Sequence, residues 1–433
     1  MNILIINTSD IGGGAERVAF DLHNSYLNLG LNSVLAVGIK KSDGKNIYII
    51  HKNQNHKKIS PKAKTIRYLW RFFTFDWPAM LRWLGFEDIY YPKSNLKKII
   101  QNFNPDIVHL HNLHGGYFDL HSLLELSKQY PILITLHDEW LLTGHCAYTI
   151  ECEKWKTGCG KCPDLIRYPG IQFDRTKINF KIKQSILSKS LFSIVSPSNW
   201  LMDQVNLSPI SPFSKRVIPN GVDKTLFNPN NRSESKEKLG FDPQETIILF
   251  LANRGKDNPY KDFKTIRESI EILSEMINQK LTFVCIGGFD SNIEYINGIK
   301  LLEMPFINDP KIISDYYRAS DIFLHATLAD NYPLTILEAL SCGTPVIATA
   351  IGGIPEQIID QEIGFLIPPK DSIKMAEKIE LLINSPDILN QMKHNASEYA
   401  KDRYSIEEMA KNYLEYYTEI IEIWKQKKIY DRS

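Results

Sequence analysis

The sequence has no run of about 18 consecutive apolar residues, so no membrane-spanning helix is expected. It has no excess of one charge either: 51 Lys and Arg oppose 50 Asp and Glu, and the formal net charge of +1 is far from the basic balance of a nucleic-acid-binding protein. Six cysteines in 433 residues are too few for a secreted disulfide scaffold. Because the first residues lack the basic flank and cleavage pattern of a signal peptide, we expect a cytoplasmic protein.

Short apolar runs recur along the chain, and longer amphipathic stretches separate them. The runs carry Ile, Leu and Val at consecutive positions, which is typical of parallel strands that are covered on both faces. The predicted strands are residues 2–7, 33–37, 107–111, 132–137, 193–196, 246–252, 281–287, 321–325, 345–349 and 364–367. Helical periodicity fills the intervals, for example in residues 15–29, 263–277 and 372–383. This alternation predicts a doubly wound α/β fold.

A turn-rich interval near residues 205–245 divides the chain. Its Pro, Asn and Ser residues precede a fresh strand, so we predict two Rossmann-like domains, an N-terminal one of residues 1–205 and a C-terminal one of residues 215–405. The helical segment 406–433 has no strand to follow, and one option is that it packs back on the first domain. Ligands bind beyond the carboxyl ends of parallel strands, so two such sheets facing each other would place their functional loops around one cleft.

Two groups in the first half follow predicted strands. Gly13 and Gly14 lie where glycines let backbone N–H groups approach a phosphate before a helix N-terminus. The NAD fingerprint fails because an arginine occupies its third glycine position, so the loop is either a phosphate-binding loop or an ordinary turn. His109 and His111 alternate along one strand and share a face, and His137 ends another. Three histidines at neighbouring strand ends indicate a site.

Carboxylates and cations follow strands in the second half. Asp330 and Glu338 are eight positions apart, and Pro333 between them is predicted at a first helical position. Carboxylates that accept from vicinal hydroxyls suit a sugar or a ribose; the alternative is a helix cap and a solvated side chain. The basic residues within 253–261 could neutralise a diphosphate, or they are simply solvated charges.

Eight motifs, taken in chain order, resemble those of the retaining glycosyltransferases of family 4. They run nearly from end to end of the chain: residues 12–17, 106–111, 135–138, 197–199, 218–223, 330–338, 342–346 and 352–356. The resemblance implies a GT-B fold, in which two Rossmann-like domains face each other across a central cleft. It also implies a hexosyltransferase-type enzyme.

The resemblance assigns donor-binding roles in the second domain. Glu338 is similar to the family glutamate that binds the nucleotide ribose, and Asp330 occupies the first position of the E-x7-E pair, with a shorter side chain than the usual glutamate. Arg254 and Lys261 resemble the Arg/Lys pair on the donor diphosphate. Their spacing is longer than usual, which leaves open whether Arg254 or Lys256 makes the first contact.

The remaining matches imply contacts from both domains. Gly13 and Gly14 would offer backbone donors to the phosphates. Asn220, within the motif 218–223, matches a donor-binding position, and His137 matches the family histidine near the reacting sugar.

The resemblance also implies a mechanism. A nucleoside diphosphate sugar loses its diphosphate through an oxocarbenium-like state, and an acceptor hydroxyl attacks the same face. The family needs no metal for this step, and the sequence has no Asp-x-Asp metal clamp. The acceptor would be a growing glycan in surface polysaccharide assembly, with a lipid-linked glycan as one form of it. The alternatives are another GT-B enzyme, such as a nucleotide-sugar epimerase, and a catalytically silent sugar-nucleotide-binding partner of a synthase complex.

Four cysteines lie within seventeen positions, with the spacing C-x5-C-x6-C-x2-C: Cys146, Cys152, Cys159 and Cys162. The final C-x2-C suits tetrahedral thiolate ligation, and four thiolates close a structural zinc site. The first two spacings are not those of a standard finger. We predict structural zinc, with a redox or disulfide pairing and plain thiols as alternatives.

Residues 51–100 differ from the rest of the chain. They hold eleven Lys and Arg against three acidic residues, and ten aromatic residues fall within 66–91. Several apolar residues lie near one helical face: Ile66, Trp70, Phe73, Trp77 and Leu84. The pattern favours an interfacial segment on the anionic inner face of the cytoplasmic membrane, and the alternative is a basic helix packed on its own domain.

Overall fold

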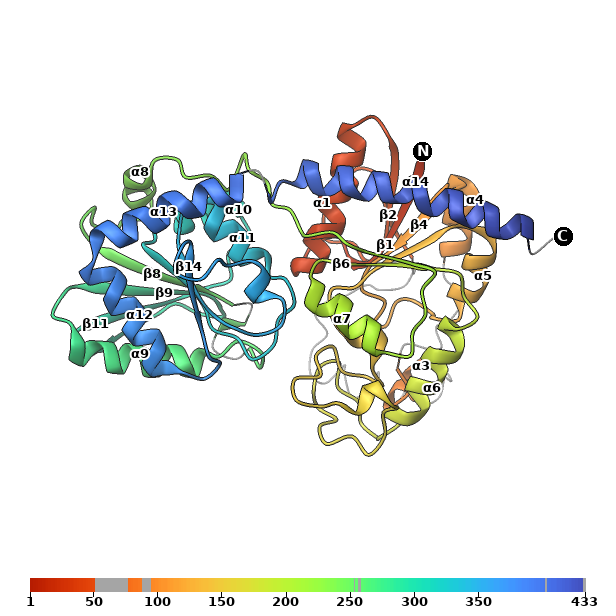
Figure 1. Ribbon diagram of the computed structural model, residues 1–433, viewed down its shortest axis with the longest axis horizontal. Coiled ribbons are helices and arrows are strands. Elements are labelled where there is room, and N and C mark those ends of the chain that lie inside the picture. Colours follow the sequence, from red (N-terminus) through yellow and green to blue (C-terminus); the bar gives the residue numbers. More distant parts are fainter. Residues whose placement is uncertain (51–76, 88–94, 253, 256–257, 402, 431–433) are drawn as a thin grey trace, which may run out of the picture. The chain divides into compact units, whose positions relative to one another are not determined.

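A computed structural model describes residues 1–50, 77–87, 95–252, 254–255, 258–401 and 403–430 (Figure 1). The chain divides into two compact units. Unit 1 comprises residues 1–218 and 410–433, and unit 2 comprises residues 219–409. Each unit has its own seven-stranded sheet and its own hydrophobic core.

The sheet of unit 1 is parallel throughout, with the strand order β3-β2-β1-β4-β5-β6-β7. Its strands are β1 (Asn2–Ser9), β2 (Asn32–Ile39), β3 (Ile47–Ile49), β4 (Ile107–Leu110), β5 (Ile132–Thr135), β6 (Ser193–Ser196) and β7 (Ser214–Val217). Every residue of β4, β5 and β6 is buried. These strands are covered on both faces, which is why their sequences are continuous apolar runs and not alternating ones.

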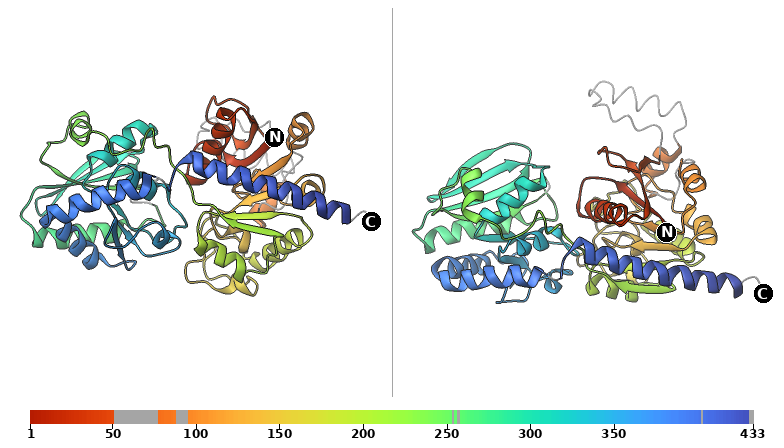
Figure 2. Two further views of the ribbon diagram at one scale, coloured as in Figure 1. Left: turned by 45° about the horizontal axis from the view of Figure 1, so that its top comes forward. Right: turned by 90° about the horizontal axis from the view of Figure 1, so that it is seen from above.

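Helices cover the sheet of unit 1 (Figure 2). They are α1 (Gly14–Asn28), α3 (Trp77–Trp83), α4 (Leu96–Phe103), α5 (Ser122–Gln129), α6 (Thr176–Leu187), α7 (Asn199–Leu207) and most of α14 (Ile406–Tyr430), with 3-10 turns η1 (Trp140–Leu142) and η2 (Lys154–Lys156). The long C-terminal helix α14 buries Tyr413, Tyr416 and Tyr417, and the Trp424 indole N–H donates to the Ser127 carbonyl. This apolar and aromatic face attaches α14 to the first half of the chain.

Unit 2 has the strand order β10-β11-β9-β8-β12-β13-β14, in which only the β10–β11 pair is antiparallel. Its strands are β8 (Thr246–Leu251), β9 (Leu281–Gly288), β10 (Asn292–Ile296), β11 (Ile299–Pro305), β12 (Ile322–His325), β13 (Val346–Thr349) and β14 (Gly364–Ile367). Its helices are α8 (Arg232–Lys238), α9 (Phe263–Met276), α10 (Pro310–Ala319), α11 (Leu334–Ser341), α12 (Ser372–Asn384) and α13 (Pro386–Lys401), with the 3-10 turn η4 (Ile354–Glu356). Both units thus follow the strand–helix alternation predicted from the sequence.

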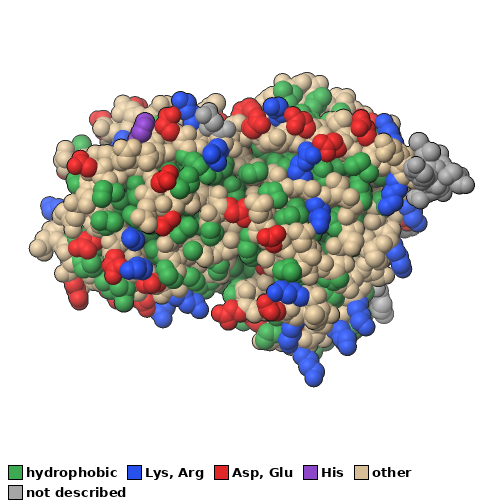
Figure 3. Space-filling model, in the orientation of Figure 1, with side chains coloured by type: hydrophobic (Ala, Val, Ile, Leu, Met, Phe, Trp, Pro, Cys, Tyr) green, Lys and Arg blue, Asp and Glu red, His purple; other side chains and the backbone are tan. Residues whose placement is uncertain are grey.

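The surface reflects the balanced composition. On the face drawn in Figure 3, Lys and Arg side chains are interspersed with Asp and Glu, and no single sign dominates. Among the helices that the structure describes, none combines the length and the apolar character needed to cross a bilayer.

Candidate active site

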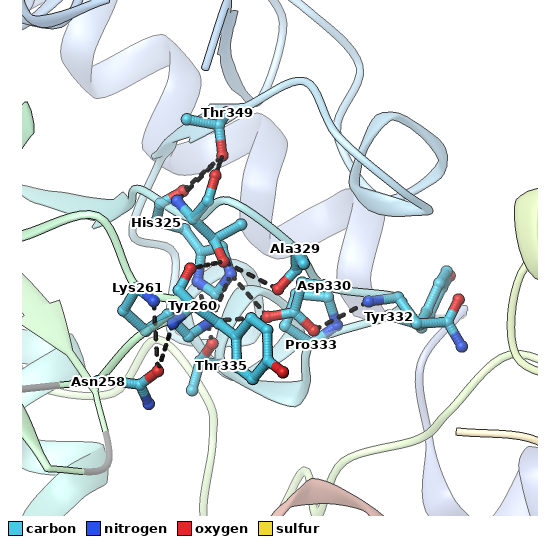
Figure 4. Close-up of polar contacts among 12 residues, drawn as sticks. Asn258, Tyr260, Lys261, His325, Ala329, Asp330, Tyr332, Pro333, Thr335 and Thr349 are labelled. Atoms are coloured by element: carbon cyan, nitrogen blue, oxygen red, sulfur yellow. Dashed lines mark hydrogen bonds and ion pairs between the residues drawn. The ribbon is translucent and has the colours of Figure 1, made fainter. Parts of the chain in front are cut away.

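In unit 2, the strands β8 and β12 end beside each other, and the loops that follow them hold a compact charged group. The Lys261 ammonium lies 2.6 Å from Asp330 Oδ2 and 3.0 Å from His325 Nε2 (Figure 4). His325 is the last residue of β12. Its Nε2 lies 3.2 Å from the same Asp330 oxygen, so three functional groups meet at one point.

Hydrogen bonds within and between the two loops fix the backbone at Lys261. Asn258 Oδ1 accepts from the backbone N–H groups of Tyr260 and Lys261, and Lys261 forms an isolated antiparallel bridge with Thr327. The Thr327 hydroxyl donates to the Tyr260 carbonyl at 2.8 Å. Lys261 therefore stands on a fixed backbone, although it lies in a loop.

The charges of this group follow from burial and proximity. Burial alone would raise the pKa of the Asp330 carboxyl, but the Lys261 charge and the His325 hydrogen bond hold it well below its usual range. Burial and the Lys261 charge lower the pKa of His325 to about 4, so the imidazole is neutral at neutral pH. A cation, a carboxylate and a neutral imidazole thus share one site. The sequence analysis did not single out His325, although it ends a strand, the same signal that pointed to His137.

Glu338 lies on α11, and a buried tyrosine on α10 positions its carboxylate. The Tyr317 hydroxyl donates to Glu338 Oε2 at 3.0 Å. Tyr317 is fully buried on α10, and burial followed by the Glu338 charge raises its pKa well above the usual value. The phenol therefore stays protonated and keeps donating. Tyr317 is a second residue that sequence reasoning missed, because it lies in the middle of an ordinary amphipathic helix.

The other predicted residues of unit 2 lie apart from these contacts. Asn220 is buried, its Nδ2 donates to the Tyr332 carbonyl at 3.1 Å, and its Oδ1 has no hydrogen-bond partner in the described part of the chain. Arg254 is exposed and has a left-handed backbone, with φ +71°. Lys256, the alternative to Arg254, lies outside the described residues.

In unit 1, the glycine loop leads directly into α1. Gly13 is the N-cap of this helix, and its N–H donates to Glu16 Oε2 at 2.9 Å. The Gly13 donor predicted for a phosphate is thus already occupied by a carboxylate, which must move aside before an anion can take its place. Gly14 is the first residue of α1.

The structure brings the three predicted histidines together. The His109 and His111 rings lie 4.2 Å apart, and His111 Nδ1 lies 2.9 Å from His137 Nε2. Burial lowers the pKa of His137 to about 4 against the opposing effect of the Asp138 charge. His111 Nε2 is buried without a partner among the described residues. His111 and His114 both line a cavity of about 20 Å³, enough space for about one water molecule.

A hydrogen-bonded chain links these histidines to α14. Tyr26 donates to the Tyr417 hydroxyl, which lies 2.7 Å from His109 Nδ1. On the other side of the ring, His109 Nε2 lies 2.7 Å from Thr135 Oγ1, which in turn contacts the Tyr413 hydroxyl at 3.0 Å. Each ring nitrogen of His109 thus contacts a hydroxyl, which can donate or accept, so both neutral tautomers find partners.

The predicted zinc site is not supported. Across the described ranges, which include all six cysteines, no group of three or more His, Cys, Asp or Glu side chains is arranged to hold a metal ion, and all six cysteines are free thiols. Burial raises the pKa of Cys146 to about 12 and that of Cys159 to about 11, so both stay protonated at neutral pH. The thiols instead pack and bond weakly in the loop, for example Cys159 Sγ to the Gly144 N–H at 3.2 Å. Of the three alternatives, plain thiols agree with the structure.

The basic aromatic segment, residues 51–100, is only partly described. Ile66, Trp70 and Phe73 lie outside the described residues. Helix α3 is described, and its last residue, Trp83, is 60% exposed and contacts the Phe173 ring edge to face at 5.4 Å between centroids. The contact of this segment with a membrane stays a prediction.

Comparison with known proteins places both halves of the chain. Residues 12–226 match the family described as Glycosyltransferase Family 4, and residues 231–403 match Glycosyl transferases group 1. The putative colanic acid biosynthesis glycosyl transferase WcaC of Escherichia coli K12 is 26% identical over 442 residues, covering 96% of this chain and 99% of that protein. A D-inositol 3-phosphate glycosyltransferase of Rhodococcus jostii is 28% identical over 213 residues, 46% of each chain.

Solved structures share the fold over nearly the whole chain. Sucrose-phosphate synthase of Thermosynechococcus elongatus has a TM-score of 0.66 at 16% identity, covering 98% of this chain and all of that one. Anabaena Alr3699/HepE, solved in complex with UDP-glucose, has a TM-score of 0.64 at 16% identity, covering 97% of this chain and all of that one. At this level of identity the likeness concerns the architecture alone.

Proposed function

Because the chain belongs to glycosyltransferase family 4 and has the GT-B fold, we propose that it is a retaining enzyme that moves a sugar from a nucleoside diphosphate sugar to a growing glycan without a metal ion. The pathway proposed is surface polysaccharide biosynthesis. Its support is the match to WcaC over nearly the full length of both chains.

The observation that carries the proposal is the charged group of unit 2. Lys261 is a cation on a fixed backbone at the carboxyl end of a parallel sheet, where such folds bind nucleotides. We assign it to the donor diphosphate, with Arg254 or Lys256 as the second cation. Glu338 is assigned to the ribose hydroxyls and Asp330 to the donor sugar. Asn220 is assigned to the donor as well.

The chemistry follows from these charges. The bond between the sugar C1 and the diphosphate oxygen breaks first, and negative charge grows on the leaving diphosphate, where Lys261 stabilises it. The acceptor hydroxyl then bonds to C1 from the same face, and its proton passes to the departing phosphate oxygen. A fixed cation lowers the barrier because it needs no reorganisation as the charge develops.

Unit 1 would bind the acceptor and also contact the reacting sugar and the donor phosphates. His137 is neutral at neutral pH, so it can accept a hydrogen bond from a sugar hydroxyl without repelling a cationic transition state. Gly13 and Gly14 are assigned to the phosphates, through a helix N-terminus that is freed when Glu16 moves. We also propose a lipid-linked acceptor and a cytoplasmic protein that docks peripherally on an anionic membrane through the basic aromatic segment.

The test is a screen of UDP-, GDP- and ADP-sugars by thermal shift, followed by assays with the donor that binds. A bound donor stabilises the folded chain in proportion to its affinity and concentration. Release of the nucleoside diphosphate, with the anomeric configuration of the product read by NMR, supports a retaining transferase. Binding without turnover favours the silent partner, and an isomeric sugar nucleotide as product favours an epimerase. Inversion at C1 contradicts the proposal.

A further inference from the structure

His325 faces two groups that make opposite demands on one nitrogen. Lys261 Nζ lies 3.0 Å and Asp330 Oδ2 lies 3.2 Å from the same atom, Nε2. An ammonium has no lone pair, so it bonds to Nε2 only where Nε2 is unprotonated. A carboxylate has no proton, so it bonds to Nε2 only where Nε2 carries one. The imidazole satisfies one partner at a time.

The other ring nitrogen is matched to both arrangements. His325 Nδ1 lies 3.3 Å from Thr335 Oγ1, and a hydroxyl donates or accepts as required. With Lys261 on Nε2, the proton is on Nδ1 and Thr335 accepts it. With Asp330 on Nε2, the proton is on Nε2 and Thr335 donates to Nδ1. Both neutral tautomers of His325 therefore have partners on both nitrogens.

Asp330 is held in place independently of Lys261. Its Oδ1 accepts from the Asn331 N–H at 3.0 Å, while Lys261 contacts Oδ2 alone. His325 is fully buried, at 0% exposure, on the end of a central strand. Of Lys261, Asp330 and His325, Lys261 has the longest and most flexible side chain, so its ammonium is the group that moves.

We propose that His325 is a positioning residue that replaces Lys261 as the partner of Asp330 when Lys261 turns to an anionic ligand. Before binding, Lys261 bridges Asp330 and His325. When a diphosphate takes the ammonium, His325 changes tautomer and donates Nε2–H to Asp330, which stays ionised and keeps its orientation. The inference rests on the proposed function, in which Lys261 contacts the donor diphosphate.

The exchange balances without net uptake of a proton. One proton leaves Nδ1 and one arrives at Nε2, and the ring is neutral in both states. Thr335 is partly exposed, and its hydroxyl would connect Nδ1 to solvent for this transfer. The benefit is that moving a cation to the ligand does not leave a buried carboxylate without a partner, which would be costly.

The direct test is the tautomer of His325 with and without ligand. The full chain labelled with 15N-histidine is titrated with UDP, GDP and ADP, and calorimetry identifies which of them binds. Long-range 1H–15N correlations report the tautomer, and the His325→Gln spectrum assigns the signal. We expect the proton on Nδ1 in the free protein and on Nε2 at saturation. The same tautomer in both states overturns the inference.

Kinetics give a second readout. His325→Leu removes both arrangements and should lower kcat/KM for the donor by about 10- to 100-fold, the range for a lost hydrogen bond to a charged group. His325→Gln, with a donor and an acceptor on one amide, should recover part of that loss. Ser341→Ala is the matched control on α11, because its buried hydroxyl has no hydrogen-bond partner in the described residues. Unchanged kcat/KM in His325→Leu contradicts the proposal.

The outcomes separate this inference from the proposed function. If calorimetry detects no nucleotide binding to the intact protein, the proposed function fails and this inference fails with it. If a nucleotide binds and Lys261→Ala weakens the binding while the His325 tautomer stays the same, only this inference fails. If His325→Leu does not fold, as judged by circular dichroism, the tautomer measurement on the unaltered protein decides alone.

Discussion

Two lysines, one in each unit, show how differently a buried cation can be used. In unit 1, Lys183 on α6 has three oxygen partners: it forms an ion pair with Glu87 at 2.8 Å and donates to the carbonyls of Trp140 and Thr143 at 2.9 and 3.1 Å. Its side chain is 1% exposed. In unit 2, Lys261 is 15% exposed and has two partners among the described residues. A fully buried ammonium with three oxygen partners is a structural cross-link, and a partly exposed one with two partners can still bind a ligand.

The largest expected effect is on stability in unit 1. Lys183→Met leaves the Glu87 carboxylate buried without its cation, which should reduce the free energy of unfolding by about 3–5 kcal/mol. Lys261→Met should cost less, because Asp330 keeps His325 as a partner and its side chain is 17% exposed. Urea unfolding measures both, with exposed Lys181→Met on α6 as the control. Equal losses of the free energy of unfolding in Lys183→Met and Lys261→Met would contradict the difference between the two lysines.

The second effect is on turnover, and it concerns Lys261 in unit 2. Lys261→Ala should lower turnover at saturating donor by about 2–4 kcal/mol of barrier, roughly 30- to 1,000-fold, through loss of a charge-stabilising donor. Lys264→Ala removes an exposed lysine from the first turn of α9 and is the matched control. Steady-state kinetics measures both. Unchanged turnover in Lys261→Ala would refute its assignment to the diphosphate.

A smaller effect concerns the Glu338 carboxylate. Tyr317→Phe removes the hydrogen bond to Glu338 and should weaken donor binding by about 1.5–3 kcal/mol, the range for a bond to a charged group. The neighbouring Tyr316→Phe is the control, since its hydroxyl contacts Met304 Sδ. Donor affinity by calorimetry distinguishes them. Equal affinities in the two variants would mean that Tyr317 does not position Glu338.

The smallest effect is common to both units and depends on pH. The pKa values of His137 and His325 are lowered to about 4, below the unfolded value near 6.5. Protons therefore favour the unfolded chain, and the stability present above pH 6.5 is lost as the pH falls toward 4. Between pH 7 and pH 6 each histidine should account for less than about 1 kcal/mol.

Single substitutions apportion this pH dependence between the units. His137→Asn and His325→Gln should each flatten the fall of the free energy of unfolding between pH 7 and pH 5, measured by urea titration. Exposed His394→Asn is the control. If neither buried histidine changes the slope, the acid sensitivity comes from other groups.

The sequence predicted the central strands and the edge strand β14, and missed the other three edge strands. Each of the ten predicted strands is present, with its ends within two residues of the prediction. The strands that were missed are β3, β7 and β10, which are edge strands, and β11, which lies next to an edge. Four of the five residues of β10 are at least partly exposed, and no residue of β7 is buried. Strands with a solvated side lack the continuous apolar run that identifies a central one.

Local details of the site were harder to predict. Pro333 was predicted at a first helical position, but it is the N-cap of α11, which begins at Leu334. The spacing of Asp330 and Glu338 did identify residues near the carboxyl end of β12. The partners Tyr317 and His325 carry no motif, because a positioning hydrogen bond depends on a distance in space and has no characteristic spacing along the chain.

By itself, the sequence determined the alternation of strands and helices and the strand ends where charged residues gather, because burial on both faces of a sheet demands consecutive apolar residues. Only the tertiary structure decided which lysine is fully buried and which is partly exposed, and that the four closely spaced cysteines form no metal-binding group in the described part of the chain. The reason is that the partners come from distant positions: Lys261 meets Asp330 across 69 residues, and Lys183 meets the Trp140 carbonyl across 43. Spacing along the chain does not indicate such contacts, because they form only when folding brings distant segments together.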